Sequence, residues 1–464
     1  SLVAVWSATA NGNQDVFGKI VSAPLPVFGN FSSVSKLNSV DTGAQINPDV
    51  AALPNNRFVM VYEDRAGNDG SVSGIFGGIY DADTRLIHDC GVVNTTTNSF
   101  QEFPHVAAAP NGNFMVIWRN FTNTFAQRYT ATCEKIGDET FIGATFNGLD
   151  VTTDAAGNFW VVLSNAGKAY LSKYSNAGEV LVDKVLLTEY LLPERPERTV
   201  IKVLGNGQVL VSWYNIESSG SSDIYGVYVN ADGSMTTAPF VINTTTADNQ
   251  SMPLIDSLTG GGFVAAWTSV NVAGVKDIVA RIFAEDGTAG GEIVVSATVI
   301  SDQSNPYVVG RAGGGFTVGW TNTAAPQHVN LYSYDANGEP VGQQIAVSVD
   351  ESVALTGSDN IELAELGDGS LVAVWSATAN GNQDVFGITL SALAPEERPD
   401  ADLDGIEDGL DPDDDNDGVL DVNDAYPLIS LDGRSDTDSD GRPNDCDGDC
   451  EVLGMAADTD DDND

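Results

Sequence analysis

The segment Ser1–Gly18 reads SLVAVWSATANGNQDVFG, and Ser370–Gly387 repeats it residue for residue near the other end of the chain. Each copy holds an apolar strand that ends in Trp, a polar loop, and a second strand in which apolar residues alternate with polar or small ones. This alternation is typical of β-strands. The first and the last unit of the repetitive region therefore carry the same pair of strands.

Between the two copies the apolar strand recurs six more times in a diverged form. The eight occurrences are Leu2–Trp6, Phe58–Tyr62, Phe114–Trp118, Phe159–Leu163, Val209–Trp213, Phe263–Trp267, Phe316–Trp320 and Leu371–Trp375. Each unit continues with an alternating strand, a turn and a further strand. Most units then pass through a Gln-x-x-Pro motif, seen at Gln45/Pro48, Gln101/Pro104, Gln250/Pro253 and Gln303/Pro306. No convincing helical periodicity accompanies them.

Four short strands repeated at this period are the signature of a β-propeller, in which each blade buries its faces against its neighbours. We therefore predict an all-β fold over residues 1–392, a seven-bladed or alternatively an eight-bladed propeller of four-stranded repeats. The row of Trp side chains is interpreted as core packing between blades.

The strand count favours seven blades. Over all units together, the sequence contains seven first strands, eight second (Trp) strands, eight third strands and seven fourth strands. One pair of second and third strands is therefore in excess. We hypothesise that Ser1–Gly18 and Ser370–Gly387 fit the same slot of one ring, whose last blade mixes strands from both ends. The surplus hairpin would then be available to another molecule, giving a homo-oligomer or filament by strand exchange. The alternatives are an eight-bladed ring with incomplete end blades, or a duplication without consequence.

Residues 393–399 are Pro-rich and predict a short stiff linker. Beyond it, residues 400–464 hold 25 of the 66 acidic residues of a chain whose net charge is −46. Such a charge repels nucleic acid and anionic lipid and favours cations. No apolar stretch is long enough to span a membrane.

The acidic residues of the tail follow the spacing of calcium loops. Ca²⁺ takes six to eight oxygens, which short loops supply from positions 1, 3, 5 and 12, with a Gly at position 6. Three loops and the start of a fourth fit this frame, and the predicted metal ligands are Asp400, Asp402, Asp404, Asp408, Asp411, Asp413, Asp415, Asp417, Asp421, Asp424, Asp436, Asp438, Asp440, Asp447, Asp458, Asp460 and Asp462. Prolines between the loops exclude the flanking helices of an EF-hand.

This tail resembles thrombospondin type 3 repeats, although it is poor in Cys. The resemblance implies a chain wound around a row of calcium ions with almost no apolar core. The stretch Asp424–Leu428 is similar to the version found in secreted bacterial proteins, and the propeller units resemble repeats of bacterial surface and adhesin-like proteins. Calcium sites of this extracellular kind bind at roughly 10⁻⁴–10⁻³ M.

The cysteine count agrees with an oxidising compartment. Cys90, Cys133, Cys446 and Cys450 suit one or two disulfides, whose pairing the sequence leaves open. The chain opens in mid-strand and stops in mid-motif, which suggests a longer precursor. We therefore expect a secreted or cell-surface protein, of bacterial origin by the resemblance.

The sequence offers little sign of catalysis. His88, His105 and His328 are scattered among different units, and no nucleophile elbow or phosphate loop is present. We accordingly predict that the chain is not an enzyme but a calcium-binding structural or adhesive protein. Its propeller would contact glycans or other surface proteins, and its tail would act as a spacer. The alternative is a secreted glycan-degrading enzyme, a polysaccharide lyase or glycosidase, which a cluster of Arg, Tyr, His and Glu in one pocket would favour.

Overall fold

The chain divides into two compact units, Ser1–Ala392 and Leu393–Asp464, and each is described by itself. The computed structural model describes residues 2–10, 13–21, 28–31, 34–40, 42–144, 148–165, 168–189, 196–216, 221–246, 249–270, 274–296, 302–322, 329–347, 353–354, 361–379, 382–392, 415, 418–420, 425–426, 429–431, 434–437, 442–446 and 455–459. Within these ranges no helix is long and apolar enough to cross a membrane.

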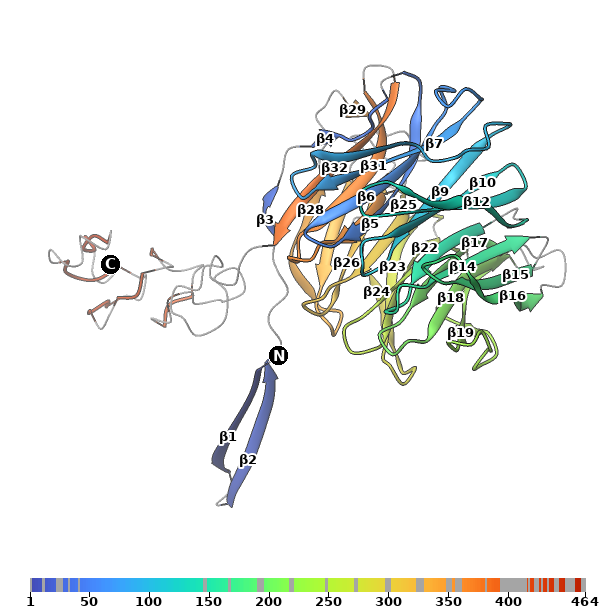
Figure 1. Ribbon diagram of the computed structural model, residues 1–464. Coiled ribbons are helices and arrows are strands. Elements are labelled where there is room, and N and C mark those ends of the chain that lie inside the picture. The colour runs from blue at the N-terminus through green and yellow to red at the C-terminus, as the bar shows by residue number, and fades with distance from the viewer. Residues whose placement is uncertain are drawn as a thin grey trace. The chain divides into compact units, whose positions relative to one another are not determined.

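Among the described residues, the first unit contains a ring of seven small antiparallel sheets and one further two-stranded sheet (Figure 1). The first sheet of the ring consists of β5 (Gln45–Leu53), β6 (Arg57–Asp64), β7 (Gly74–Asp81) and β8 (Leu86–Val92). The second consists of β9 (Gln101–Ala108), β10 (Phe114–Asn120), β11 (Asn123–Tyr129) and β12 (Lys135–Ala144). The third consists of β13 (Gly148–Thr153), β14 (Phe159–Asn165), β15 (Lys168–Tyr174) and β16 (Val180–Glu189). The fourth sheet consists of β17 (Pro196–Val203), β18 (Val209–Ile216), β19 (Ser222–Val229) and β20 (Phe240–Val241). The fifth consists of β21 (Gln250–Ser257), β22 (Phe263–Val270), β23 (Lys276–Phe283) and β24 (Ala289–Val294). The sixth consists of β25 (Gln303–Gly310), β26 (Phe316–Asn322), β27 (Val329–Tyr334) and β28 (Pro340–Val347). We number these blades one to six in chain order.

Blade seven takes strands from both ends of the first unit and closes the ring. It is formed by β29 (Val353–Ala354), β30 (Ile361–Glu365), β31 (Leu371–Ala379), β32 (Asn382–Ala392), β3 (Phe28–Phe31) and β4 (Ser35–Lys36). The early strands β3 and β4 both pair with β32, and β30 lies beside β5 of blade one. The prediction of seven blades with one mixed blade is confirmed, and the eight-bladed alternative is excluded.

The N-terminal copy of the repeated segment does not pair with any described strand of the ring. Strands β1 (Leu2–Ala10) and β2 (Asn13–Val21) form a two-stranded sheet of their own. Their register is the same as that of β31 with β32, from Leu2 opposite Val21 to Ala10 opposite Asn13. The C-terminal copy thus fills the slot in blade seven, while donation of β1–β2 to a second chain remains a prediction.

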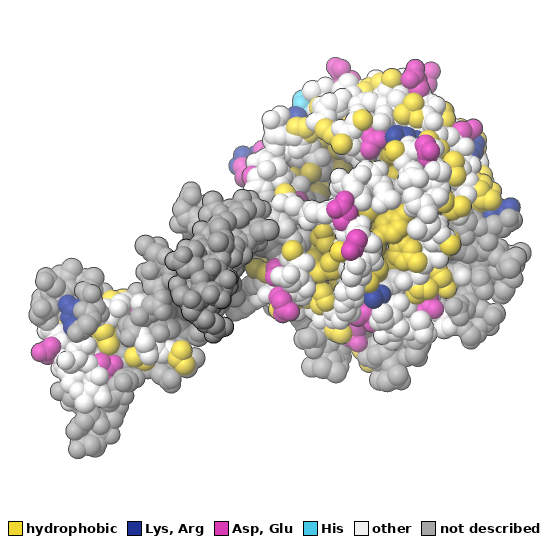
Figure 2. Space-filling view, turned by 90° about the horizontal axis from the view of Figure 1, so that it is seen from below, with side chains coloured by type: hydrophobic (Ala, Val, Ile, Leu, Met, Phe, Trp, Pro, Cys, Tyr) yellow, Lys and Arg dark blue, Asp and Glu magenta, His cyan; other side chains and the backbone are white. Residues whose placement is uncertain are grey.

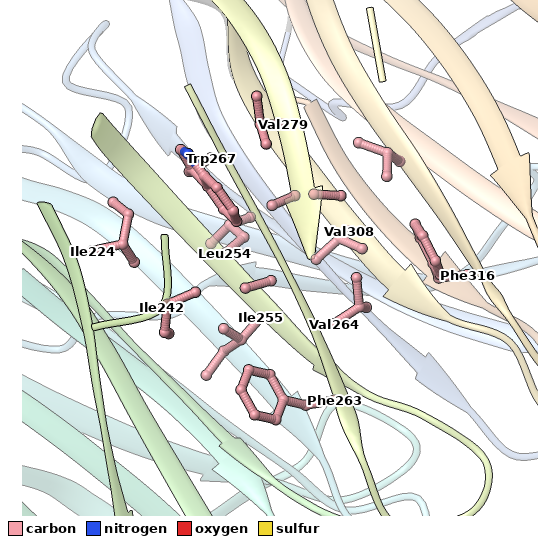
Figure 3. Close-up of a cluster of buried hydrophobic side chains, with 14 of the residues drawn as sticks. Ile224, Ile242, Leu254, Ile255, Phe263, Val264, Trp267, Val279, Val308 and Phe316 are labelled. Carbon is pink, nitrogen blue, oxygen red and sulfur yellow. The ribbon is translucent and has the colours of Figure 1, made fainter. Parts of the chain in front are cut away.

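The Trp side chains are buried between blades, as the repeat predicts. Trp118 and Trp267 are both completely buried, and their indole N–H groups donate to the side-chain oxygens of Gln101 and Gln250 at 2.9 Å. In these blades the Gln of the Gln-x-x-Pro motif therefore satisfies the one polar group of the Trp, which would otherwise be costly to bury. Figure 3 shows Trp267 in a cluster with side chains of neighbouring blades.

A disulfide between Cys90 of β8 and Cys133, in the turn between β11 and β12, links blade one to blade two across 43 residues. Cys446 of the tail is disulfide-bonded as well. Replacing Cys90 and Cys133 together by Ser is expected to lower the free energy of unfolding by about 2–4 kcal/mol, because the unfolded chain gains freedom. Urea unfolding of the propeller measures this, and a reductant should lower the unfolding midpoint of the wild type more than that of the double variant. An unchanged unfolding midpoint would contradict a structural role for the bond.

Candidate functional site

A pocket of about 590 Å³ lies where the innermost strands of all seven blades meet. Its walls come from β5, β9, β13, β17, β21, β25 and β30, so residues distant in sequence face one another across it. Figure 2 shows acidic and basic side chains scattered over the visible, described face of the propeller. The pocket, in contrast, brings several ionisable groups together.

One position of the innermost strand supplies most of these groups. It lies opposite the residue before the large side chain of the second strand, and across the seven blades it holds Asp49, His105, Asp150, Val200, Leu254, Tyr307 and Glu362. Five consecutive blades, from six through seven to three, therefore place a titratable residue here. Blades four and five place apolar residues instead.

Blades four and five have charged residues two positions away from Val200 and Leu254 on the same strands. Arg198 and Lys202 of β17 and Asp256 of β21 line the pocket. Lys202 forms an ion pair of 2.5 Å with Asp256. Arg198 lies in a β-bulge with a φ of 47°, and bulges of this kind redirect side chains. The same bulge recurs at Asn47, Phe103, Met252 and Asn305 in other blades.

Two of the carboxylates also connect blades. Asp49 accepts from the N–H groups of Val50 and Val106, each at 2.7 Å. Asp150 accepts from Val151 at 2.8 Å and from Ile201 at 2.9 Å. Each side chain is thereby fixed between its own blade and the next. Their role is to hold structure and to orient whatever lies between them.

His105 lies between these two carboxylates. Its Nδ1 is 3.5 Å from Asp49 Oδ2 and 3.8 Å from Asp150 Oδ1. Burial lowers the pKa of His105, but the hydrogen bond to Asp49 and the charges of Asp49 and Asp150 outweigh it and raise the pKa above its usual value. Burial likewise raises the pKa of Asp150. The imidazole is therefore held as a cation at a higher pH than a solvated histidine.

Tyr307 and Glu362 form a second pair, on blades six and seven. The Tyr307 hydroxyl donates to a carboxyl oxygen of Glu362, and this contact by itself lowers the pKa of Glu362. Burial, and then the charge of Asp49, raise the pKa of Glu362 well above its usual value, although Arg198 opposes the shift. Burial and the surrounding carboxylates, Glu362 first, raise the pKa of Tyr307 well above 10. The raised pKa favours the protonated form of Glu362, which is the form that a general acid needs.

This site is not evident from the sequence. The scatter of the histidines among different units reads as a sign against catalysis, whereas a propeller brings one position of every unit to a common axis. A usable signal was present: the residue after the Pro of the Gln-x-x-Pro motif changes from Asp49 to His105 to Tyr307 while the flanking residues keep their character. Variation of this kind at one repeat position marks a site, because packing alone would keep it apolar.

The predicted calcium ligands lie almost entirely outside the described residues. Those not described are Asp400, Asp402, Asp404, Asp408, Asp411, Asp413, Asp417, Asp421, Asp424, Asp438, Asp440, Asp447, Asp460 and Asp462. Asp415, Asp436 and Asp458 are described, and the described residues contain no group of three or more metal-ligating side chains.

The third loop of the tail is the one whose ends can be followed. Asn444 donates its backbone N–H to the Ser435 carbonyl at 2.7 Å, and its side chain accepts from the Thr437 N–H at 2.9 Å. These bonds bring position 1 of the loop, Asp436, near position 9, Asn444, as a calcium loop requires. The described ends of this loop thus lie close together, and calcium binding by the loop stays a prediction.

Comparison with known proteins gives a fold and no family. No protein-family model matches the sequence, and no curated protein does. An ulvan lyase, a polysaccharide lyase solved with a bound GlcA–Rha3S sugar, is similar with a TM-score of 0.51 and 9% identity over 75% of this chain and 94% of that chain. A protein of unknown function from Dyadobacter fermentans has a TM-score of 0.49 and 10% identity over 78% and 98%. A Trypanosoma rangeli sialidase has a TM-score of 0.41 and 11% identity over 75% and 54%.

These neighbours correct one expectation from the sequence. The prediction that the chain is not an enzyme is contradicted, since its fold is shared with a polysaccharide lyase. The error has a physical reason, because the candidate residues lie far apart in the chain and meet only in the closed ring. The cluster of Arg, Tyr, His and Glu that would favour the enzymatic alternative is present in the axial pocket as Arg198, Tyr307, His105 and Glu362.

Proposed function

We propose that this protein is a glycan-degrading enzyme that cleaves its polymer in the axial pocket of the propeller. The observation that carries the proposal is the convergence of His105, Arg198, Tyr307 and Glu362 in one pocket of about 590 Å³. That volume is typical of a ligand site and suits a short stretch of sugar chain. Perturbed pKa values concentrated in such a pocket are the usual mark of acid–base chemistry.

Hydrolysis adds the elements of water across a glycosidic link, whereas elimination transfers a ring C–H proton to a base; in both routes the departing oxygen receives a proton. Glu362 would supply that proton, since its raised pKa favours the protonated form, and the Tyr307 hydroxyl is hydrogen-bonded to it. His105, held between Asp49 and Asp150, would stabilise negative charge that develops on the sugar. The hydrogen bonds from backbone N–H groups keep those two carboxylates in place during the reaction.

The direct test is to incubate the protein with a panel of acidic and neutral polysaccharides and to measure new chain ends and chain length. We expect at least one polymer to be shortened. A glycan that binds without being shortened would instead support the adhesive function, in which the propeller is only a contact module. Neither binding nor shortening across the panel would contradict both functions.

We further propose that the tail binds Ca²⁺ and that the protein works outside the cell. The loop closure between Ser435 and Asn444 supports the first point. The disulfide between Cys90 and Cys133 supports the second, because such bonds persist in oxidising compartments. In this arrangement the tail would be a calcium-stiffened spacer attached to a catalytic propeller.

Removal of calcium is expected to expand the tail, because residues 400–464 carry a net charge of −23 and repel one another without bound cations. Sedimentation velocity in millimolar Ca²⁺ and then in chelator should show a smaller coefficient at unchanged mass. Replacing Asp436, Asp438 and Asp440 by Asn should lower the number of bound ions. A sedimentation coefficient that ignores both changes would end the calcium proposal.

A further inference from the structure

The carboxylates of the axial pocket are already paired, although they outnumber the cations. Asp256 is engaged with Lys202, and Glu365 lies 3.0 Å from the guanidinium of Arg311. Asp49 and Asp150 receive backbone N–H groups and face His105, as described above. Burial raises the pKa of Glu362, which favours its neutral form. The pocket is therefore less hostile to an anion than its count of acidic residues suggests.

Arg198 differs from Arg119 and Lys202, the other Arg and Lys residues that line the pocket. No ion pair joins its guanidinium to a carboxylate whose side chain is described, whereas Lys202, Arg311 and Arg119 each have one. It remains partly exposed where it lines the pocket. Since four other blades carry a neutral residue at this bulge, the bulge itself does not explain the charge. A cation left without a described partner in a ligand pocket points to a partner on the ligand.

Arg198 also affects the pKa values of two titratable residues of the pocket, His105 and Glu362. Its charge lowers the pKa of His105 and that of Glu362, so the guanidinium lies within electrostatic reach of each. A group bound to Arg198 would consequently sit beside the imidazole and next to the proton donor. An arginine fork binds carboxylate or sulfate oxygens in a fixed plane, which orients as well as attracts.

We propose that Arg198, together with His105, binds the anionic group of an acidic sugar, so that the substrate is an acidic polysaccharide rather than a neutral one. The inference rests on the proposed glycan-cleaving function and adds the class of substrate. The anion is a uronate carboxylate or a sulfate ester, which share this chemistry. Arg198 is a binding residue in this scheme, and the sugar ring it holds is the one placed against Tyr307 and Glu362.

The test compares three polymers: a polyuronate, the same polymer after reduction of its carboxyl groups, and a sulfated neutral polysaccharide. Wild-type protein should cleave an acidic polymer, and it should cleave the carboxyl-reduced polymer at least about tenfold more slowly. Replacing Arg198 by Gln should lower kcat/KM on the acidic polymer by about 10- to 100-fold, with Arg198→Lys intermediate. The control is Arg85→Gln, a surface change outside the pocket where the side chain is 73% exposed, and it should leave all rates unchanged.

The outcomes separate the inference from the function on which it rests. Cleavage of the carboxyl-reduced polymer as fast as its parent, with no preference for the sulfated one, would overturn the inference and leave the function standing. If no polymer is cleaved, binding of the acidic polymers by calorimetry decides. Binding that weakens about 10-fold or more in Arg198→Gln supports the anion site without the enzyme, and equal binding by both proteins overturns it. Preference between polyuronate and sulfated polymer identifies the anion.

Discussion

Replacing Trp375 by Ala is expected to lower the free energy of unfolding of the propeller by about 3–5 kcal/mol, whereas the same change at Trp6 should lower it by less than about 0.5 kcal/mol. The two residues occupy the same position in two separate but identical 18-residue segments, so their local β-strand propensity is the same. Trp375 is completely buried in blade seven. Strand β1, which contains Trp6, pairs only with β2 among the described strands.

The sequences just beyond the repeat explain why the C-terminal copy occupies the ring. After Gly387 the chain continues with Ile388, which is 4% exposed and packs in the core of blade seven. After Gly18 it continues with Lys19 at the corresponding place. Burying an ammonium group without a partner costs several kcal/mol. The N-terminal hairpin is therefore the weaker occupant of the slot.

Urea unfolding followed by Trp fluorescence measures both variants, and sedimentation at increasing protein concentration adds the oligomeric state. A larger loss for Trp6→Ala than for Trp375→Ala would mean that the N-terminal hairpin fills the slot. Oligomers that dissociate in Trp6→Ala would support strand exchange with a second copy. A monomeric wild type that ignores the Trp6 change would remove strand exchange.

The fold could be predicted from the sequence because its determinants are local and repeated. The Trp strands fix the period, and the identity of Ser1–Gly18 with Ser370–Gly387 fixes the ring at seven blades with one shared slot. Strands β3 and β4 then supply the outer strands that blade seven lacks. Each of these conclusions follows from counting elements, and no contact between distant residues had to be known.

The axial site could not be predicted in the same way. His105, Tyr307 and Glu362 belong to three different units, and their meeting depends on the closed ring. Their pKa values depend further on burial and on neighbours such as Asp49 and Asp150. The bulge that turns Arg198 toward the pocket is visible only in the backbone. The sequence showed which position repeats, and only the structure showed that this position lines a pocket.

The catalytic variants Glu362→Gln and Tyr307→Phe are expected to lower kcat by about 10²–10⁴-fold on any polymer that the wild type cleaves, because each removes a proton donor with little change in volume. The matched controls are Glu339→Gln and Tyr332→Phe. Both positions lie on blade six and neither lines the pocket. They should retain nearly full activity. Chain-end release under saturating polymer gives kcat directly.

The pH dependence gives the same prediction a second, independent check. Glu362 must be protonated to act, so activity should fall as pH rises through its raised pKa. The folded state binds this proton more tightly than the unfolded state, so the wild type loses stability over the same rise in pH. Glu362→Gln has no such proton and should gain stability relative to the wild type as the solution becomes alkaline. An inactive variant that is also less stable at high pH would show that Glu362 supports the fold rather than the reaction, and the acid would then have to be sought at Tyr307 alone.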